Sequence, residues 1–325
     1  MRYCFALLLA AVLATAAEPP TPDADLKVVP RGLAIRPSAP GDNTLTQEKV
    51  ALGRRLFSDP ILSGDRTVSC ATCHLPDRGF AGSDALAVGV RGQKNRRNAP
   101  TLLNIAYSPV FFWDGRAATL EEQALKPIAD PREMASNADD AVARLRADPS
   151  YVSQFQKAFG DAVTTQNLAR ALASFERTLL SGDSAVDRFR HGQVTDLNDD
   201  AKQGLWLFEG RGGCWKCHSG NTLSDGRFHN TGVAWGAGDL GRYEVTHRDS
   251  DRGAFKTPTL RDVARTAPYM HDGSLATLEE VVRYYGRGGN PNPHLDKDLK
   301  PVEFSDDDIK HLVAFLNALT GAQPR

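Results

Sequence analysis

Four cysteines and two histidines of the chain occur in two copies of the pattern C-x-x-C-H. The copies are Cys70-Ala71-Thr72-Cys73-His74 and Cys214-Trp215-Lys216-Cys217-His218. Two thiols at this spacing can add to the vinyl groups of a porphyrin, and the histidine that follows at once can bind the iron as its proximal ligand. The pattern therefore predicts two covalently bound c-type haems.

Three other uses of these cysteines explain less of the pattern. A zinc site of four cysteines would leave both histidines unexplained, and residues 74–213 separate the pairs, far more than the roughly 15–20 residues of a zinc ribbon. A thioredoxin-like redox pair is expected within a βαβ unit, which the flanking sequence does not suggest. Two disulfides would suit an exported protein but again ignore the histidines.

The ligand on the far side of each iron separates an electron carrier from a catalyst, because a catalyst needs an open position. No histidine occurs between His74 and His191, and the methionines after the initiator are Met134 and Met270. The first haem therefore lacks an obvious sixth ligand from its own half of the chain, and we predict that it is open.

An internal repeat gives a candidate ligand for the second haem. Residues 99–122 align without a gap with residues 257–280, an offset of 257 − 99 = 158, and the same offset places Pro127 on Tyr285. Proline offers no donor atom to iron, whereas a phenolate is a known axial ligand. From the residues alone, Tyr285 is equally well explained as a half-buried aromatic side chain, and Met270 is a weaker candidate ligand.

The elements around these motifs are predicted to be helices. Apolar residues recur at helical spacing after Thr165 and after Ser305, which are candidate N-caps. The two stripes are Leu168, Leu172, Phe175 and Leu179, and Ile309, Leu312, Val313, Leu316 and Leu319. Strand-like alternation is scarce, and glycine and proline crowd residues 75–100 and 220–256, which we expect to be long loops around the haem pockets. The predicted fold class is all-α.

The duplicated motif and the repeat predict two cytochrome c-like haem domains with long loops, related by internal duplication. We expect an N-terminal, peroxide-reactive domain over residues 18–190 and a C-terminal, electron-transferring domain over residues 191–325, with a linker near residues 181–198 that contains two glycines. The division gives each domain one C-x-x-C-H motif and one copy of the repeat.

The start of the chain predicts export. Arg2 is followed by an apolar run over residues 5–14 and by Ala14-Thr-Ala-Ala17, a pattern typical of a signal peptide over residues 1–17. We therefore expect the mature protein in the periplasm. With 39 basic and 40 acidic residues, the chain has no charge excess that would favour nucleic acid or a membrane surface as a partner.

The chain resembles the bacterial di-haem cytochrome c peroxidases and the related MauG oxidases over nearly all of its predicted mature length. The resemblance rests on the two C-x-x-C-H motifs and on Arg97-Asn-Ala-Pro-Thr101, Phe112-Trp-Asp-Gly-Arg116, Glu122-Gln123, Pro131-Arg-Glu-Met134, Thr266-Ala-Pro-Tyr269 and His271-Asp-Gly273. It implies that Trp113 lies between the two haems, and that Gln123 and Glu133 lie in the pocket above the first.

The same resemblance implies two further sites. Tyr285 matches the axial tyrosine of the MauG-like branch, where typical peroxidases have methionine. Asn98, Thr266 and Pro268 match residues that surround a calcium ion at the domain interface, largely through carbonyl and amide oxygens.

One departure from typical peroxidases changes the expected resting state. Those proteins carry a histidine in the loop before the Asn-Ala-Pro segment, which caps the first haem, whereas this chain has Gly89-Val90-Arg91-Gly92 there. The first haem should therefore be five-coordinate or water-bound, and peroxide could bind without prior reduction. In this respect the chain is nearer to MauG.

The implied activity is reduction of hydrogen peroxide, with Glu133 moving protons and Gln123 orienting the bound oxygen species. Electrons would come through the second haem from a small periplasmic cytochrome or copper protein. Two alternatives stay open: a MauG-like oxidase that uses peroxide to modify side chains of a partner protein, and a di-haem electron carrier without turnover.

Overall fold

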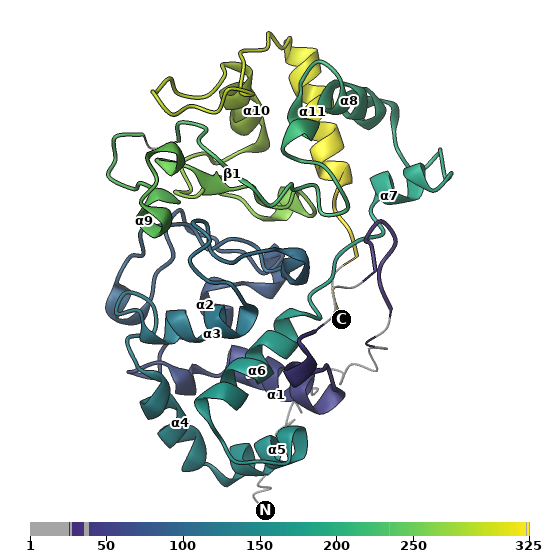
Figure 1. Cartoon of the computed structure of the whole chain (residues 1–325). Helices are drawn as coiled ribbons and strands as arrows, with labels where there is room; N and C mark the ends of the chain where they lie inside the picture. The colour runs from purple at the N-terminus through teal and green to yellow at the C-terminus, as the bar shows by residue number, and fades with distance from the viewer. Residues whose placement is uncertain (1–25, 27, 36–38, 234, 323, 325) are drawn as a thin grey trace, which may run out of the picture.

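The structure of the chain is a computed structural model that describes residues 26, 28–35, 39–233, 235–322 and 324. The predicted signal peptide, residues 1–17, lies outside the described residues. Helices make up most of the regular structure, and they form two groups, one in the lower and one in the upper half of Figure 1. The prediction of a mostly helical fold is confirmed.

The lower group contains α1 to α6, and the upper group contains α7 to α11. Their bounds are α1 (Gln47–Ser58), α2 (Cys70–Cys73), α3 (Leu120–Ala129), α4 (Ala138–Arg146), α5 (Pro149–Phe159), α6 (Thr165–Glu176), α7 (Ala185–Arg190), α8 (Asp199–Glu209), α9 (Tyr243–Thr246), α10 (Leu278–Gly286) and α11 (Asp306–Ala318). The described strands are β1 (Phe228–His229) and β2 (Phe255–Lys256), which pair antiparallel with Phe228 opposite Lys256.

Each group of helices surrounds its own apolar core. The first core joins α1, α3, α4, α5 and α6 through residues such as Leu56, Phe155 and Leu168. The second joins α7, α8, α10 and α11 through residues such as Val186 and Phe315. α7 thus packs with the second core although it precedes the predicted domain boundary at residue 190.

The central helix pair of each core approaches closely at a glycine. A Cβ atom on Gly53 of α1 would lie 2.0 Å from the carbonyl oxygen of Ala171 in α6. A Cβ on Gly204 of α8 would lie 1.9 Å from the carbonyl oxygen of His311 in α11. Glycine is therefore required at both crossings, since any larger residue would push the helices apart.

The helix starts follow the side-chain capping rules, with one shift from the sequence-based prediction. The N-cap of α6 is Thr164, whose side chain accepts from the backbone N–H of Asn167, and not Thr165. Ser305 caps α11 as predicted and accepts from the N–H of Asp308. Adjacent threonines both suit an N-cap, so composition alone does not separate them.

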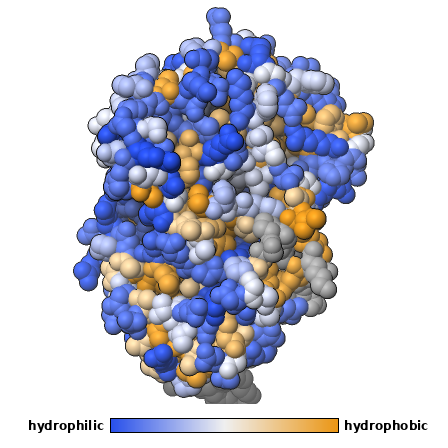
Figure 2. All heavy atoms as spheres, in the orientation of Figure 1, coloured by the Kyte–Doolittle hydropathy of each residue, from blue (hydrophilic) through white to orange (hydrophobic). Residues whose placement is uncertain are grey.

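Long loops and short turns fill the region where the two groups of helices meet, and β1 and α9 lie along this junction in Figure 1. Figure 2 shows that the face turned to the viewer is mostly hydrophilic, with small apolar patches near the level of the junction. No helix of the described part of the chain is long and apolar enough to cross a membrane.

Candidate active site

A cavity of about 810 Å³ lies at the junction of the two halves and is lined by residues of both C-x-x-C-H motifs. The motif residues on its wall are Cys73, His74, Cys214, Cys217 and His218. Cys70 is not part of the wall and packs against the first apolar core. No disulfide joins these four cysteines among the described residues, as the bonding of both pairs to a porphyrin requires.

The first motif is held by a short helix and two carbonyl groups. The cysteines begin and end α2, which Ser69 caps. His74 follows directly, and its Nδ1 atom lies 3.1 Å from the carbonyl oxygens of both Phe80 and Pro100. Since a carbonyl can only accept, Nδ1 carries the proton and Nε2 is left unprotonated. Burial lowers the pKa of His74, which also favours the neutral ring that binds iron.

The second motif repeats this arrangement on a 3-10 turn, Cys214–Lys216. The Nδ1 atom of His218 lies 3.0 Å from the carbonyl oxygen of Leu223, and burial lowers its pKa. An Nδ1–H bond to the backbone is the usual way in which proteins orient a metal-binding histidine. The residues present at both motifs therefore fit a covalently attached haem, with Nε2 of each histidine free for its iron.

Three of the predicted pocket residues, Gln123, Pro127 and Glu133, line the same cavity as His74. Gln123 and Pro127 lie one turn apart on α3, so they share a face of the helix. Oε1 of Gln123 is buried and has no hydrogen-bond partner among the described residues. A buried acceptor without a partner is rare in proteins and suits a site that binds a hydrogen-bonding ligand.

Glu133 is held at the cavity wall by a hydrogen bond from Asn95, whose Nδ2 lies 2.5 Å from Oε1. Burial and the nearby carboxylate of Asp130 raise the pKa of Glu133, while Asn95 opposes them. A raised pKa makes the ionised carboxyl group a better proton acceptor, as a residue that takes and returns a proton requires. The structure thus brings the predicted proton-transfer residue to the cavity in a suitable electrostatic setting.

Trp113 lines the cavity where the two halves meet. Its Nε1–H donates to the carbonyl oxygen of Asn98 at 3.0 Å, and its own carbonyl oxygen accepts from the backbone N–H of Lys256 in β2. The rings of Trp113 and His271 meet edge-to-face with centres 6.4 Å apart, and His271 stacks on Phe255 with ring centres 3.6 Å apart. Trp113 therefore contacts residues of both halves of the chain.

Both candidate sixth ligands of the second haem, Tyr285 and Met270, line the cavity. Tyr285 projects from α10, and burial together with Tyr284 raises its pKa above the ordinary value for tyrosine. Met134, the other methionine after the initiator, instead packs in the first apolar core and is absent from the cavity wall.

The three predicted calcium ligands, Asn98, Thr266 and Pro268, also line the cavity. They offer neutral oxygen atoms, which suit a hard cation. However, Arg78 donates to the carbonyl oxygen of Ala267, between two of them, at 3.0 Å. Its guanidinium places a positive charge beside the site, which should weaken the binding of a cation there.

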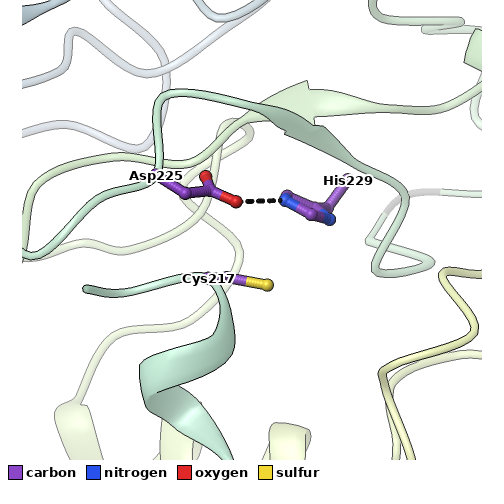
Figure 3. Close-up of side chains that lie close together, drawn as sticks. All are labelled: Cys217, Asp225 and His229. Carbon is purple, nitrogen blue, oxygen red and sulfur yellow. Dashed lines mark hydrogen bonds and ion pairs between the residues drawn. The ribbon is translucent and has the colours of Figure 1, made fainter. Parts of the chain in front are cut away.

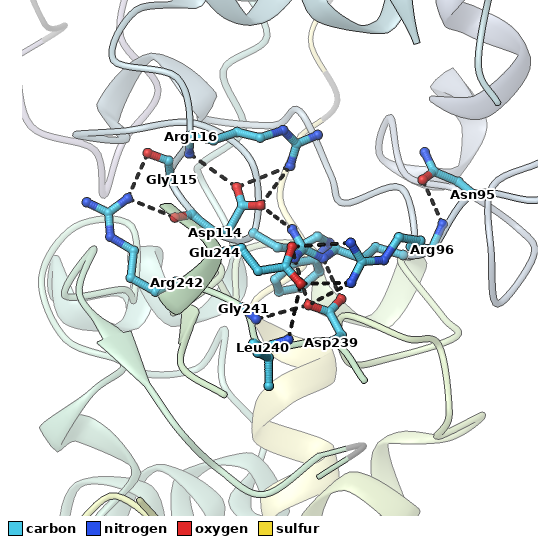
Figure 4. Close-up of polar contacts among 12 residues, drawn as sticks. Asn95, Arg96, Asp114, Gly115, Arg116, Asp239, Leu240, Gly241, Arg242 and Glu244 are labelled. Atoms are coloured by element: carbon cyan, nitrogen blue, oxygen red, sulfur yellow. Dashed lines mark hydrogen bonds and ion pairs between the residues drawn. The ribbon is translucent and has the colours of Figure 1, made fainter. Parts of the chain in front are cut away.

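A cluster that the motifs did not reveal links the two halves. Arg97 donates to Asp114 at 2.6 Å and, with two nitrogen atoms, to Asp239 at 2.8 Å. Arg96 pairs with Glu244 at 2.9 Å (Figure 4). Arg97 holds the pKa of Asp239 down at about 2 in spite of burial. Because Asp239 is more than 140 positions away from Arg97, no local pattern could have paired them.

A second unforeseen cluster lies beside the second motif and contains Cys217, Asp225 and His229 (Figure 3). His229 bonds Asp225 at 2.9 Å and Asp296 at 2.5 Å. Hydrogen bonding with Cys217, Asp296 and Asp225 raises the pKa of His229 to about 10. These ligand types could hold a metal ion, but Cys217 is the second cysteine of the haem motif, and a thioether bond would take up the sulfur atom that a metal ion needs.

Comparisons with known proteins agree with this geometry. The family model for di-haem cytochrome c peroxidase matches residues 47–195. The methylamine utilization protein MauG of Methylorubrum extorquens is 44% identical over 284 residues, which cover 86% of this chain and 80% of that protein. The cytochrome-c peroxidase IdrP1 of Pseudomonas sp. (strain SCT) is 37% identical over 346 residues, 96% of this chain and 89% of the relative.

Among solved structures, a MauG-like protein associated with microbial copper homeostasis superimposes with a TM-score of 0.82 at 34% identity, covering 92% of this chain and 95% of the other. The family-model match contains the first C-x-x-C-H motif, and the matches to the two relatives and to the solved structure are long enough to contain both motifs. The chain therefore belongs to the di-haem cytochrome c peroxidase family and is an oxidoreductase of the peroxidase type.

Proposed function

We propose that the chain reduces hydrogen peroxide at a first haem and receives electrons through a second one. The residues proposed to hold the first haem are Cys70, Cys73 and His74, and those proposed for the second are Cys214, Cys217, His218 and Tyr285. The observation that carries the proposal is that Gln123, Pro127 and Glu133 line the same cavity as His74, while Met134 packs in the first apolar core.

Each of these side chains has a distinct task. When bound, the first haem would supply an iron with an open position that accepts peroxide and cleaves its O–O bond. Glu133 takes a proton from the incoming peroxide and returns it to the departing hydroxide, for which its raised pKa is suited. The unpaired Oε1 of Gln123 accepts a hydrogen bond from the bound substrate and orients it. Pro127 fills the wall without offering a donor to iron.

The second half of the chain has the role of electron entry. Tyr285 on α10 is the proposed sixth ligand there, and Met270 is the alternative. Trp113 contacts both halves and lies on the proposed route between the haems. The repeated features support two domains, residues 18–190 and 191–325, related by duplication: Gly53 and Gly204 at the helix crossings, and the capping residues Thr119 and Thr277, which are 158 positions apart (277 − 119).

We propose a small periplasmic cytochrome c or copper protein as the electron donor, after cleavage of a signal peptide over residues 1–17. A second candidate is oxidation of side chains in a partner protein with peroxide as oxidant. It is favoured by Gly89-Val90-Arg91-Gly92 in place of a capping histidine and by the 44% identity to a MauG protein. A calcium ion held by Asn98, Thr266 and Pro268 is also proposed, with affinity reduced by Arg78.

The test is a stopped-flow reaction of the fully ferric, haem-loaded protein with hydrogen peroxide, followed by addition of reduced cytochrome c. We expect the haem absorption spectrum to change on mixing with peroxide, although neither haem has been reduced beforehand. We then expect two equivalents of reduced cytochrome c to be oxidised for each peroxide consumed. An unchanged haem spectrum after the ferric protein is mixed with peroxide would contradict the proposal. Reaction with peroxide but with no small donor would favour the second candidate, a protein substrate.

A further inference from the structure

Residues 87–97 form a hairpin beside the first haem motif. The backbone N–H of Asn95 donates to the carbonyl oxygen of Ala87 at 2.8 Å, and that of Gly89 donates to Gln93 at 2.8 Å. The tip is a 3-10 turn, Val90–Gly92, in which Arg91 has φ of 56°. The loop that carries a capping histidine in typical peroxidases is therefore a compact hairpin in this chain. We call it the 87–97 hairpin.

The tip of the 87–97 hairpin is docked on the backbone of Glu133. The N–H of Val90, a buried residue, donates to the carbonyl oxygen of Glu133 at 2.8 Å. A Cβ on Gly89 would lie 2.2 Å from the carbonyl oxygen of Arg132 and 2.3 Å from that of Glu133. The hairpin and the loop that carries Glu133 are thus in direct backbone contact.

Asn95 adds a side-chain contact to the same acid. Its Oδ1 accepts from the backbone N–H of Arg96 at 2.7 Å, as Figure 4 shows, and this fixes which end of the amide is the donor. The opposite end, Nδ2, is then directed to Oε1 of Glu133 at 2.5 Å. Asn95 itself lies on the cavity wall. The bond from the backbone N–H of Arg96 therefore orients the Nδ2 donor of Asn95 toward the carboxylate of Glu133.

The other end of the hairpin is clamped to the C-terminal half. Arg96 pairs with Glu244 of that half (Figure 4). Arg97, which is buried, pairs with Asp239 of that half and with Asp114 of its own. A buried arginine with two carboxylate partners is expensive to separate, because each charge would lose its partner away from water. Asn95 therefore lies between two anchored parts of the 87–97 hairpin: the tip, which bonds the backbone of Glu133, and the arginines at its end, which pair with acids of the C-terminal half.

We propose that Asn95 is a positioning residue for Glu133. The amide of Asn95 directs the Glu133 carboxylate into the cavity and stabilises the ionised form of that carboxylate. The inference rests on the proposed function, in which Glu133 moves the peroxide proton. The other charged groups around Glu133 are Asp130, which disfavours ionisation, and Arg116 and Arg132, which favour it. Cys73 also faces Glu133, but as a thioether it would carry no charge.

The proposal predicts a shift in pH dependence. Ionised Glu133 is the form that accepts a proton, and removal of a hydrogen bond to that form raises the pKa of the acid. In Asn95→Ala and Asn95→Leu, the rise of the peroxide reaction rate with pH should therefore move upward by about one pH unit. The leucine variant keeps the approximate volume of the side chain, so either variant that retains both haems is informative. Gln93→Ala, an exposed change on the same hairpin, is the control and should leave the profile in place.

Two further measurements separate positioning from a general structural effect. In a Glu133→Gln background, Asn95→Ala should cause no further loss of rate, since the acid through which it acts is gone. Infrared titration of the haem-loaded protein should show a carboxyl band, absent in Glu133→Gln, that titrates at higher pH in Asn95→Ala.

The outcomes also separate the role of Asn95 from the role of Glu133. An unmoved pH profile and carboxyl band in both Asn95 variants, with Glu133→Gln still slow, would overturn the role of Asn95 alone. Wild-type rates in Glu133→Gln would remove Glu133 from the mechanism and with it the basis of this inference. An additive loss in the double variant would show that Asn95 acts independently of Glu133.

Discussion

Glu133 combines a position on the cavity wall with a raised pKa, and both suit a residue that moves protons. We predict that Glu133→Gln slows the reaction with peroxide by about 10²-fold or more, because glutamine cannot exchange a proton. Stopped-flow rates at saturating peroxide measure this effect. Glu48→Gln, in the first turn of α1, is the matched control and should react at the wild-type rate.

Tyr285 and its neighbour Tyr284 form a natural pair of test and control. Tyr285 lines the cavity, whereas the hydroxyl of Tyr284 donates to the carbonyl oxygen of Thr231 at 2.7 Å. Tyr285→Phe should abolish the low-spin ferric signal assigned to the second haem, because phenylalanine has no atom that binds iron. Tyr284→Phe should keep that signal. If Tyr285→Phe leaves it unchanged, the ligand is Met270 or another group.

Among single residues, the sequence identifies those that belong to a short motif with a known chemical use. The two C-x-x-C-H motifs, together with Gln123 and Glu133 from the resemblance, could all be named in advance, and the structure gathers nearly all of them around one cavity. Asn95 could not, because an asparagine in a loop has many uses and its contact with Glu133 depends on how two loops dock. The pairing of Arg97 with Asp114 and Asp239 could not be predicted either, because it also depends on how loops dock.

The helices were foreseeable where apolar residues recur over three or more turns, as in α6 and α11. Shorter elements were not, since α2, α9 and the strands span only two to four residues and carry no measurable periodicity. Their positions are set by tertiary contacts such as the pairing of β1 with β2 at the junction. The glycines at the helix crossings could be noticed from sequence but not explained, because their need arises from the opposite helix.

The crossing of α8 and α11 gives a prediction for an element. Gly204→Ala places a Cβ within 1.9 Å of a backbone carbonyl oxygen, which cannot be relieved by a side-chain rotation. We expect a loss of about 1–3 kcal/mol in the free energy of unfolding. Denaturant titration measures it, and Gly41→Ala is the control because a Cβ there meets no atom within 4 Å. Equal stability of both variants and the wild type would contradict the close crossing.

The ion pairs of Arg97 with Asp239 and of Arg96 with Glu244 join the two halves, and the first of them makes the stability of the molecule sensitive to acid. Arg97 lowers the pKa of Asp239 to about 2, below the value of roughly 4 expected in the unfolded chain. A lowered folded-state pKa means that the pair stabilises the protein above pH 4 and that this contribution is lost as the pH falls toward 2. Asp239→Asn should therefore be less stable at pH 6 and lose less stability on acidification than the wild type. Urea unfolding at pH 3, 4, 5 and 6 tests this, and parallel profiles would contradict it.

The central claim is an asymmetry between two iron sites, one open at the cavity wall formed by Gln123, Pro127 and Glu133 and one closed by a side chain of the C-terminal half. Electron paramagnetic resonance of the resting ferric protein tests it most directly, because an open or water-bound haem is high-spin and a histidine–tyrosine haem is low-spin. We predict one high-spin and one low-spin signal of equal intensity. Two low-spin signals would contradict the account and favour an electron carrier without turnover.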